Sequence, residues 1–341
     1  MRAPDFWQDG GALSVALSPL GCLHAWAGRL RRAAVTPRSA VMPVICVGNL
    51  VAGGAGKTPV ALSLAAKLTA RTGLAGRVHA LTRGYGGELR GPVRVDPLVH
   101  DAWKVGDEPL LLARRLPTWV ARDRVAGAAA AVASGANLLI LDDGLQNPAL
   151  KKDLSFVVVD GGAGFGNGRV IPAGPLREPL GDGLGRADAV VVVGEDRVKA
   201  AARIARLRPA LPLFHARLVA TPDSAAALAG QRLVAFAGIG RPEKFFESLR
   251  ALGCELVATR AFDDHHPYDA KDVAALAALA AQQGARLVTT AKDAVRWPAD
   301  AQAVAGGDIA VLDVEIAWDD EAALDMLLAA RLAHVLPEAW P

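Results

Sequence analysis

Short apolar runs alternate with helix-like stretches along most of the chain. Six of the runs are apolar at consecutive positions, which is typical of strands buried on both faces of a parallel sheet. Helical patterns follow several of these runs and begin near Lys57, Glu108, Arg124 and Asp196. The alternation predicts an α/β domain with a parallel sheet. Its strand candidates are residues 43–50, 77–84, 118–123, 137–143, 154–161 and 188–195.

A second series of apolar runs begins after a seam at residues 219–230. We therefore expect a second, smaller α/β domain after the first. The predicted division places an N-terminal helix at residues 1–35, the larger domain at 36–222 and the smaller domain at 223–341. The strand candidates of the smaller domain are residues 232–240, 254–262, 285–293 and 309–316.

The segment from Gly10 to Arg32 has apolar residues at helical spacing. A secretory signal would carry its basic residues first, whereas here they come last, at Arg29, Arg31 and Arg32. The apolar core is also too short and too interrupted for a transmembrane helix. Two interpretations stay open: a helix in the membrane surface with its arginines on lipid phosphates, or a helix packed on the protein's own core. The spaced apolar residues are Leu13, Ala16, Leu17, Leu20, Leu23 and Ala27, with Trp7 and Trp26 near the ends.

Composition and charge narrow the class of protein. Of the 341 residues, 52% are apolar and 21% are charged, which is typical of a globular protein and argues against disorder and against a simple nucleic-acid-binding tail. The net charge is +3, yet no Asp or Glu occurs from Gly10 to Gly87, so we expect this region to face an anionic partner. The cysteines Cys22, Cys46 and Cys254 lack CxxC spacing, which predicts reduced core residues and no zinc site.

Residues 49–58 read NLVAGGAGKT and join a predicted strand to a predicted helix. A glycine-rich loop that ends in Gly-Lys-Thr at a helix start is typical of nucleoside triphosphate binding, because its backbone N–H groups can approach the phosphates closely. We expect Lys57 to bridge the outer phosphates and Thr58 to ligate magnesium. The usual pattern has a glycine where this chain has Val51, and a tight strand-to-helix turn is the alternative. The residues expected to hold the nucleotide are Gly53, Gly54, Ala55, Gly56, Lys57 and Thr58.

Two acidic pairs stand at the ends of predicted elements. Asp142 and Asp143 follow an apolar strand, where a Walker B carboxylate would hold magnesium, although one of them could cap the next turn instead. Asp107 and Glu108 precede Pro109 at a predicted helix start, where an N-terminal cap is the ordinary role. A kinase also needs a carboxylate that accepts the proton of its substrate hydroxyl, and this position could supply one.

Nine blocks in this order and spacing together resemble the tetraacyldisaccharide 4'-kinase family of lipid A biosynthesis. The resemblance covers nearly the whole chain, from about residue 18 to about residue 315. It rests most on the phosphate loop, but eight further blocks are in register with that loop. The blocks are CVGNLVAGGAGKTP (46–59), TRGYGG (82–87), VGDEP (105–109), ARDRVAGA (121–128), LDDGLQN (141–147), IPAGPLREPL (171–180), FAGIGRPEKFFESL (236–249), FDDHHPY (262–268) and TTAKDAVR (289–296).

The resemblance implies a fold, a reaction and a location. The fold is a P-loop NTPase-like parallel sheet domain with an N-terminal membrane-surface helix and a second, smaller α/β domain. The reaction transfers the γ-phosphate of ATP, with Mg²⁺, to the 4'-hydroxyl of a tetraacylated glucosamine disaccharide 1-phosphate. The location is the cytoplasmic face of the inner membrane, as a peripheral, monotopic protein with no nucleic-acid partner. The resemblance also favours the membrane interpretation of the first helix over the packed one.

The resemblance assigns roles only where its motifs match. Asp107 falls on the proposed general base and His265 on the histidine that assists it; His266 is the alternative because the two histidines adjoin. An imidazole can orient an aspartate, which alone is a weak base at neutral pH, and can share its proton. Lys57 and Thr58 keep the roles given above, and Asp142 and Asp143 form the acidic metal pair. The charged residues implied at the substrate or nucleotide phosphates are Arg83, Glu108, Arg124, Arg177 and Glu178, with Glu178 orienting an arginine.

Two other classes of protein remain as alternatives. A partition-type or chaperone-type P-loop ATPase would use the same loop to drive association, but Ala52 stands where the partition ATPases have their signature lysine. A GTP-binding switch is a weaker alternative. Its guanine-reading N-K-x-D is matched only by TTAKD at residues 289–293, without the asparagine and in the second predicted domain. ATP consumption that rises with an acylated disaccharide would favour the kinase.

Overall fold

The computed structural model describes residues 4–71, 73–298 and 309–339. These residues form two compact units. The larger unit takes in residues 4–71, 73–100, 104–218 and 316–339, and the smaller one takes in residues 219–298 and 309–315 together with Asp101–Trp103. Each unit has its own sheet and its own apolar core.

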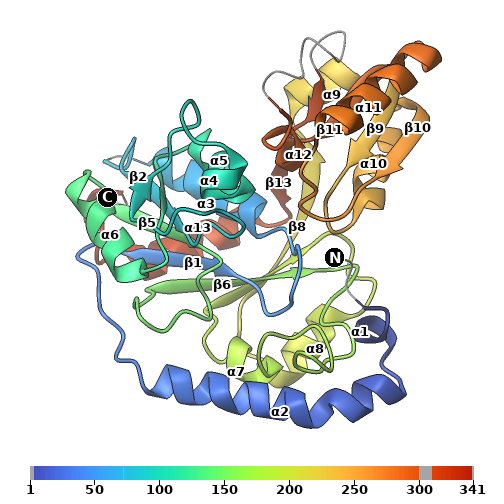
Figure 1. The fold of residues 1–341 in the computed structure, drawn as a ribbon. Coiled ribbons are helices and arrows are strands. Elements are labelled where there is room, and N and C mark those ends of the chain that lie inside the picture. The colour runs from blue at the N-terminus through green and yellow to red at the C-terminus, as the bar shows by residue number, and fades with distance from the viewer. Residues whose placement is uncertain (1–3, 72, 299–308, 340–341) are drawn as a thin grey trace. The chain divides into compact units, whose positions relative to one another are not determined.

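A nine-stranded sheet runs through the larger unit (Figure 1). The paired strands from β8 to β4 are parallel, and the two-residue strand β3 is antiparallel to β4. The predicted α/β fold class is therefore confirmed, and all six predicted strands of this unit are present. In spatial order the strands are β13 (Val314–Trp318), β8 (Leu213–Ala220), β7 (Ala189–Val193), β6 (Leu154–Asp160), β1 (Val44–Gly48), β5 (Leu138–Asp142), β2 (Val78–Thr82), β4 (Thr118–Val120) and β3 (Val93–Arg94).

Helices cover both faces of this sheet, because the strands are apolar on both sides. Leu64 and Leu68 of α3 lie in the core cluster on one face, and Ala128 and Ala131 of α6 lie in the cluster on the other. Burial of this kind stabilises the unit by roughly 25 cal/mol per Å² of apolar surface. The first face is covered by α3 (Lys57–Thr69), α5 (Asp107–Ala113) and α13 (Glu321–Leu332), and the second by α6 (Arg124–Ala133), α7 (Leu180–Leu184) and α8 (Ala200–Leu207).

The last part of the chain differs from the predicted domain division. The apolar run at 309–316 is two strands, β12 (Ala310–Leu312) and β13, which belong to different sheets. After β13 the chain packs on the larger unit, because Leu324, Leu328 and Leu332 recur every fourth residue and face its core. Trp318 also donates an indole hydrogen bond of 2.8 Å to Oγ of Ser63. Residues 316–339 thus lie with the larger unit, although the sequence division placed them in the smaller domain.

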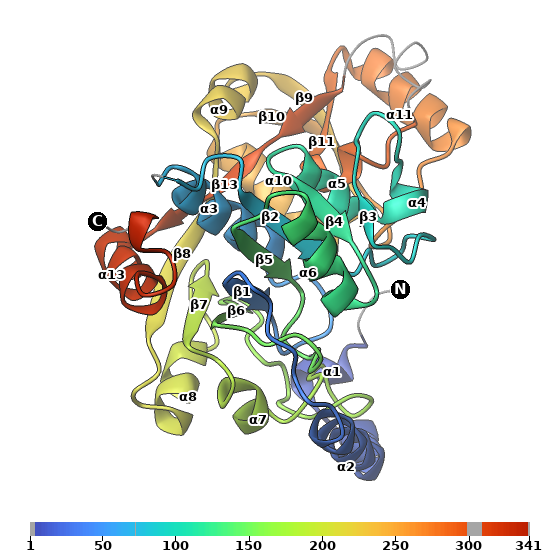
Figure 2. The same cartoon turned by 90° about the vertical axis from the view of Figure 1, so that its left-hand side faces the viewer.

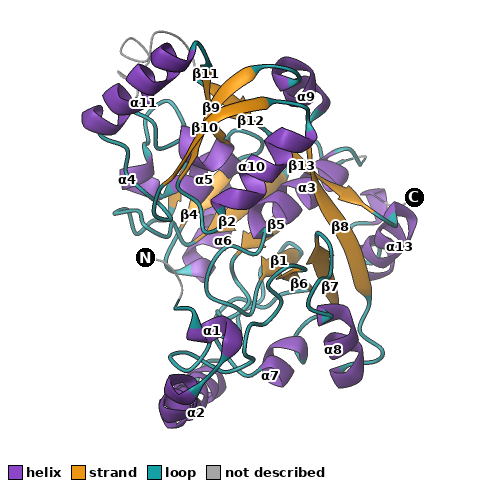
Figure 3. Ribbon diagram, turned by 90° about the vertical axis from the view of Figure 1, so that its right-hand side faces the viewer, coloured by secondary structure: helices purple, strands orange, loops and turns teal. Residues whose placement is uncertain are grey.

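The smaller unit has a parallel sheet in the order β10-β9-β11-β12, which Figures 2 and 3 show from two sides. The core lies on both faces of this sheet, with Phe246 on one side and Phe236 on the other. The loops after β9, β10 and β11 all leave the carboxyl edge of the sheet. Besides β12, its elements are β9 (Arg232–Ala237), β10 (Glu255–Ala261), β11 (Arg286–Thr290), α9 (Pro222–Leu228), α10 (Pro242–Ala251), α11 (Ala270–Gln283) and α12 (Ala291–Ala294).

Two N-terminal helices, α1 (Phe6–Asp9) and α2 (Ala12–Ala33), lie along the larger unit beside α7 and α8 (Figures 1 and 2). The face of α2 that meets the protein is made of the small residues Ser14, Gly21 and Ala25. Ser14 donates a hydrogen bond of 2.6 Å to the carbonyl of Ala173. Gly21 allows close packing, because a Cβ there would lie 2.7 Å from a backbone oxygen of the neighbouring loop.

Most of the large apolar residues of α2 are exposed, and Leu17 is half-buried. The helix packs on the protein as the second interpretation expected, but through small residues and not through its leucines. Cys22 is also exposed on this helix, so its expected core position is wrong, whereas Cys46 and Cys254 are buried. No helix among the residues described is long and apolar enough to cross a membrane. The exposed apolar residues are Leu13, Val15, Leu20, Leu23, Trp26 and Leu30, each exposed by 49% to 58%.

The basic residues at the end of α2 do not all face outward as expected. Arg29 forms an ion pair with Asp182 at 2.6 Å, and Arg32 lies 3.3 Å from Glu178. These contacts fasten the end of α2 to the start of α7. Arg31 is exposed, so of the three expected lipid-facing arginines it fits that role best.

Candidate active site

The glycine-rich loop connects the end of the central strand β1 to the start of α3. Gly56 is the N-cap of α3 with a φ of 83°, a conformation that glycine adopts without strain, and no side chain caps the helix. The backbone N–H groups at the start of α3 could therefore bind an anion, because no side chain caps them and the dipole of α3 favours negative charge there. Lys57 and Thr58 open the helix and are buried to 7% and 9% exposure.

A second loop braces the first half of the glycine-rich loop. The amide of Ala52 donates to the carbonyl of Pro175, and the amide of Arg177 donates to the carbonyl of Leu50, both at 2.8 Å. Val51 therefore lies in a short β-bridge with Leu176, which explains why a valine fits where the usual pattern has a glycine. The unusual loop sequence does not disturb the Gly-Lys-Thr turn that follows.

Asp142 lies beside this loop because β5 pairs with β1, with Val47 opposite Asp142. Thr58 donates a hydrogen bond of 3.0 Å from Oγ1 to Oδ2 of Asp142. The Oδ1 atom of Asp142 is buried and has no hydrogen-bond partner among the residues described. Burial raises the pKa of Asp142, and the negative charge of Glu108 raises it further. A buried carboxylate oxygen in this state fits a cation that would neutralise it.

Asp143 has a different environment from Asp142. Nη1 of Arg177 lies 2.7 Å and 3.0 Å from the two carboxylate oxygens of Asp143, and Nζ of Lys57 lies 3.7 Å from Oδ2. Burial acts to raise the pKa of Asp143, but the charges of Lys57 and Arg177 outweigh it and hold the pKa below its ordinary value. Asp143 is thus an ionised carboxylate that is already paired with the side chains of Lys57 and Arg177.

Arg124 approaches the same site from the start of α6. Its side chain is 3% exposed, and its Nε atom has no hydrogen-bond partner among the described part of the chain. Burial lowers the pKa of Arg124 to about 10, and the charge of Arg83 contributes, while Asp143 and Asp142 oppose the shift. These interactions gather Arg83, Arg124 and the acidic pair at the carboxyl ends of β2, β4 and β5, which are neighbours in the sheet. Two guanidinium groups here fit phosphate oxygens.

Asp107 and Glu108 form the first turn of α5. Asp107 is 4% exposed, and its Oδ1 atom accepts a hydrogen bond of 2.9 Å from the amide of Glu108. Glu108 is half-buried, and its charge acts on Asp142, so the segment lies within electrostatic reach of the acidic pair. The expected capping role is wrong, because the N-cap of α5 is Gly106 and no side chain caps this helix, whereas a role at the site stays a prediction.

Glu178 pairs with two arginines, Arg186 and Arg32. Nη2 of Arg186 lies 2.6 Å and 2.7 Å from the two oxygens of Glu178, which is 2% exposed. Gln146 was not singled out in the sequence, yet it donates from Nε2 to the carbonyl of Asn49 at 2.9 Å and to Glu178 at 3.1 Å. Gln146 thereby ties the glycine-rich loop to the 175–178 segment. Its position in the same strand-end loop as the acidic pair is the signal that could have identified it.

His265 lies in the smaller unit, in the turn after β10. Its φ is 60°, and its Nε2 atom is 3.4 Å from Nζ of Lys292. The ring of His266 instead contacts Asp272, with 2.8 Å between Nε2 and Oδ2, and stacks on Phe262. The fold thus holds His266 in place on both sides, which leaves His265 as the better candidate of the two.

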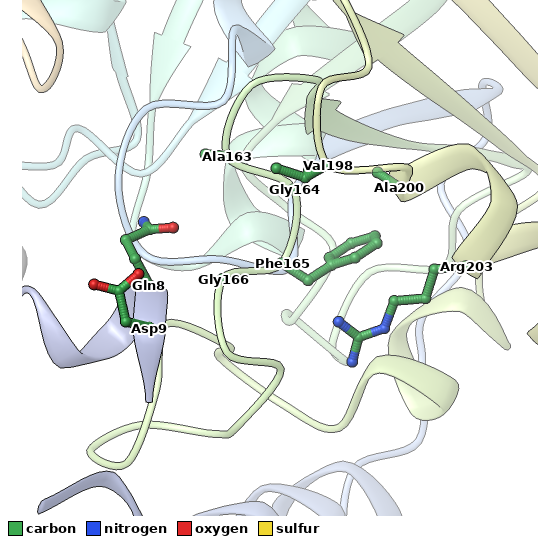
Figure 4. Close-up of a pocket in the computed structure, with 9 residues that line it drawn as sticks. All are labelled: Gln8, Asp9, Ala163, Gly164, Phe165, Gly166, Val198, Ala200 and Arg203. Atoms are coloured by element: carbon green, nitrogen blue, oxygen red, sulfur yellow. The ribbon is translucent and has the colours of Figure 1, made fainter. Parts of the chain in front are cut away.

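A cavity of about 220 Å³ lies away from the glycine-rich loop, between α1, the loop after β6 and the start of α8 (Figure 4). The guanidinium of Arg203 lies over the ring of Phe165 at 5.6 Å, and Gln8 and Asp9 face it from α1. None of the predicted site residues lines this cavity. Within the described ranges, no group of three or more His, Cys, Asp or Glu side chains is arranged to hold a metal.

Comparison with known proteins gives one consistent result. A family model described as tetraacyldisaccharide-1-P 4'-kinase matches residues 13–333. Curated proteins named tetraacyldisaccharide 4'-kinase are similar over nearly their whole length. The protein of Rhodospirillum centenum is 55% identical over 98% of this chain and 97% of its own, and that of Rhodospirillum rubrum is 50% identical over 97% and 99%.

A solved structure agrees with these relatives. The crystal structure of LpxK from Aquifex aeolicus in complex with ATP has a TM-score of 0.75 and 26% sequence identity to this chain. It covers 94% of this chain and 99% of its own. The likeness therefore extends over both units.

Proposed function

This chain belongs to the tetraacyldisaccharide-1-phosphate 4'-kinase family, and we propose that the residues around its glycine-rich loop perform the family's reaction. The enzyme phosphorylates the 4'-hydroxyl of tetraacyldisaccharide 1-phosphate with ATP, a step of lipid A biosynthesis. The partition-type or chaperone-type ATPase is not favoured. The observation that carries the proposal for the site is the buried Oδ1 of Asp142 beside Thr58, which has no hydrogen-bond partner among the described residues.

The phosphates of ATP would bind at the start of α3. The backbone N–H groups of the 53–58 segment would hold the phosphate oxygens, and Lys57 would offset charge on the transferred group. Thr58 and Asp142 are the residues that fit Mg²⁺, because Asp142 has a free buried oxygen while Asp143 is already paired with Arg177 and Lys57. A bound Mg²⁺ would draw charge from the phosphates and make the leaving group better.

Asp107 would accept the proton of the 4'-hydroxyl as the oxygen attacks the γ-phosphorus. The O–P bond to the sugar forms, the bond to the ADP oxygen breaks, and the proton of the hydroxyl passes to the carboxylate. His265 would orient this carboxylate and share the proton. The support for this pair is the motif match, the burial of Asp107 and the contacts of the His266 ring with Asp272 and Phe262, which turn that ring to other partners.

The arginines would hold phosphate groups. Arg124 is the strongest candidate, because its buried Nε atom lacks a partner among the described residues and its charge is close enough to feel Asp142 and Asp143. Arg83 is exposed, and its charge acts on Arg124. An exposed guanidinium beside Arg124 could bind the 1-phosphate of the disaccharide or the outer phosphates of the nucleotide. Glu178 would act indirectly, through Arg186 and Gln146.

The membrane attachment follows from α2. We propose that α2 lies in the cytoplasmic face of the inner membrane with Leu20, Leu23 and Trp26 in the lipid, because its small-residue face is taken up by the protein. An acylated substrate would then reach the enzyme at the membrane surface. Arg31 would contact lipid phosphates, whereas Arg29 and Arg32 are held by Asp182 and Glu178.

The experiment that tests the proposal is a transfer assay. Purified protein, ATP labelled in the γ-position and tetraacyldisaccharide 1-phosphate in detergent should yield a product heavier by one phosphoryl group, in a Mg²⁺-dependent manner. ATP consumption that proceeds equally without the disaccharide would contradict the kinase assignment. Loss of product in Arg124→Ala with a raised KM for either substrate would identify which phosphate this arginine holds.

A further inference from the structure

The segment TTAKDAVR covers the end of β11 and all of α12, and it has no part in the chemistry described above. Its central residue, Asp293, is fully buried. The Oδ1 atom of Asp293 accepts hydrogen bonds from the amide of Gly238 at 2.8 Å, from Tyr268 at 2.8 Å and from Arg296 at 2.7 Å. A buried carboxylate with this many partners is a fixed point of the structure. It cannot also read a guanine base, so this segment gives no support to a GTP switch.

Arg296 links the buried carboxylate of Asp293 to two backbone carbonyls. Its side chain is 6% exposed, and its two terminal nitrogens donate to the carbonyls of His266 and Gly238, both at 3.0 Å. Gly238 follows β9, and His266 belongs to the turn after β10. The planar guanidinium therefore bridges two loops at the carboxyl edge of the sheet with fixed geometry, which a flexible ammonium could not reproduce.

His265 is attached to the same point. Its amide donates to the carbonyl of Gly238 at 3.0 Å. The φ of 60° at His265 is uncommon for a residue with a side chain and costs on the order of 1 kcal/mol, so the surrounding contacts must impose it. Close packing of the turn depends on a glycine at 238, because a Cβ there would lie 2.9 Å from the carbonyl of Asp263 and 3.1 Å from Cβ of His266.

Lys292 completes the arrangement at the imidazole itself. Its Nζ atom lies 3.4 Å from Nε2 of His265. The same Nε2 atom lies 3.8 Å from Oδ1 of Asp264, so the imidazole is placed between a cation and a carboxylate. Lys292 precedes Asp293, so the residue that contacts the ring and the residue that fixes the turn lie on one short helix.

We propose that Asp293 and Arg296 are positioning residues for His265, and that Lys292 helps to orient its ring. The proposal rests on the proposed role of His265 in proton transfer. The competing view is that Asp293 and Arg296 are only a buried ion pair that stabilises the smaller unit. The hydrogen bonds of Arg296 favour positioning. Its two terminal nitrogens bind the carbonyl of His266, next to His265, and the carbonyl of Gly238, which also accepts the amide of His265.

The test is a double-mutant cycle on Arg296 and His265. Arg296→Lys keeps the charge beside Asp293 but can no longer hold both carbonyls. We expect it to lower kcat by about tenfold or more with KM for ATP unchanged within about twofold, since the nucleotide loop belongs to the larger unit. In the His265→Ala background the same change should have no further effect, because a positioning residue has nothing left to position.

A control separates positioning from stability. Leu249→Ala removes a fully buried side chain of α10 in the same unit and should lower the melting temperature at least as much as Arg296→Lys. It should leave kcat within about twofold at a temperature where the protein is folded. If Arg296→Lys lowers kcat equally in both histidine backgrounds, or only in proportion to its loss of melting temperature, positioning is ruled out.

Lys292 supplies a second route that does not touch the buried ion pair. Lys292→Met should lower kcat with little loss of stability, and Lys292→Arg, which keeps a donor, should restore most of it. Equal kcat in all three proteins would overturn the proposed role of Lys292. If His265→Ala leaves kcat unchanged, His265 has no role in proton transfer and the proposal is overturned with it. If His265→Ala lowers kcat but Arg296→Lys lowers it further by the same factor, the role of His265 stands and only the positioning role of Arg296 is overturned.

Discussion

The hydroxyl of Thr58 donates to Oδ2 of Asp142 across 3.0 Å, which joins the first turn of α3 to the end of β5. The same carboxylate keeps its Oδ1 atom buried with no partner among the described residues. One oxygen is therefore used by the fold and the other is left for a ligand. Asp143, next in the chain, is paired with Arg177 and Lys57, so in the proposed function Asp142 is the aspartate that would hold the metal.

Asp142→Asn should separate activity from stability. The amide keeps an acceptor for Thr58 but loses the charge that would hold Mg²⁺. We expect kcat to fall by on the order of 10² and the Mg²⁺ concentration for half-maximal rate to rise. A Mg²⁺ titration of the initial rate measures both. An unchanged Mg²⁺ dependence would move the metal to another residue.

The same variant makes a prediction about pH in the metal-free protein. Because burial raises the pKa of Asp142 above the ordinary value of about 3.9, its charged form opposes folding, and stability is lost as pH rises through the raised pKa. Asp142→Asn removes this loss. Its melting temperature relative to the parent should therefore be higher at about pH 8 than at about pH 6, measured with chelator present. A difference that shrinks with rising pH would contradict the raised pKa.

Lys57→Ala should abolish measurable transfer while the fold survives. The side chain is buried at the start of α3 but belongs to neither apolar cluster of the larger unit, and in the proposed function its charge would act on the transferred phosphoryl group. Loss of such a group lowers kcat by on the order of 10² to 10³. Lys67→Ala is the matched control, since it removes a lysine from the same helix at a distance from the loop, where Lys67 pairs with Glu321. Normal turnover in Lys57→Ala would remove the nucleotide-binding assignment of this loop.

The strand-to-helix turn of the glycine-rich loop was predictable, because a phosphate-binding loop requires particular residues in sequence: glycines for close approach, then Lys57 and Thr58. The orientation of α2 was not predictable in the same way. Both of its faces contain apolar residues, and the choice depends on the polar carbonyls and close packing that the neighbouring loop offers to Ser14 and Gly21. Likewise, the return of α13 to the larger unit depends on which sheet its leucines can reach, which no local pattern encodes.

The β8 strand shows another limit of the sequence pattern. Leu213–Ala220 alternates between buried and exposed residues at its start and is exposed further on, so the run is not continuously apolar and was not recognised. The network around Asp293 was missed for a different reason. Its members are Tyr268, Asp293 and Arg296, and they meet only because β9, β10 and β11 end at one edge of a sheet.

Thiol labelling should modify one cysteine in the native protein. Cys22 is exposed on α2, whereas Cys46 is buried in β1 and burial raises its pKa to about 12. Burial also raises the pKa of Cys254. Since the thiolate is the reactive form, a maleimide at neutral pH should add once, at Cys22, and three times after unfolding. Peptide mass mapping identifies the site; rapid labelling of Cys46 in the native state would contradict the described core.

This cysteine also provides a probe for membrane binding. A polarity-sensitive dye on Cys22 should shift to shorter wavelength when anionic vesicles are added, because α2 would enter the interface. Leu20→Glu with Leu23→Glu should weaken vesicle binding by on the order of 10² or more, since each buried leucine contributes about 2 kcal/mol. Leu98→Glu, at a residue 96% exposed elsewhere in the larger unit, is the matched control. Unchanged sedimentation of the double variant would place the anchor outside α2.

The proposed base and its histidine lie in different units of the chain, so their cooperation has to be measured and not read from either unit alone. Asp107→Ala and His265→Ala should each lower kcat by on the order of 10² or more, the range expected for loss of general-base catalysis. If the two groups act as one, the double variant should be little worse than the poorer single variant. Binding of ATP should survive in all three, because Lys57, Thr58 and Asp142 are untouched. His334→Ala, at an exposed histidine, is the control for the loss of an imidazole. If the two factors by which kcat falls multiply in the double variant, or if His265→Ala leaves kcat unchanged, Asp107 works without the histidine.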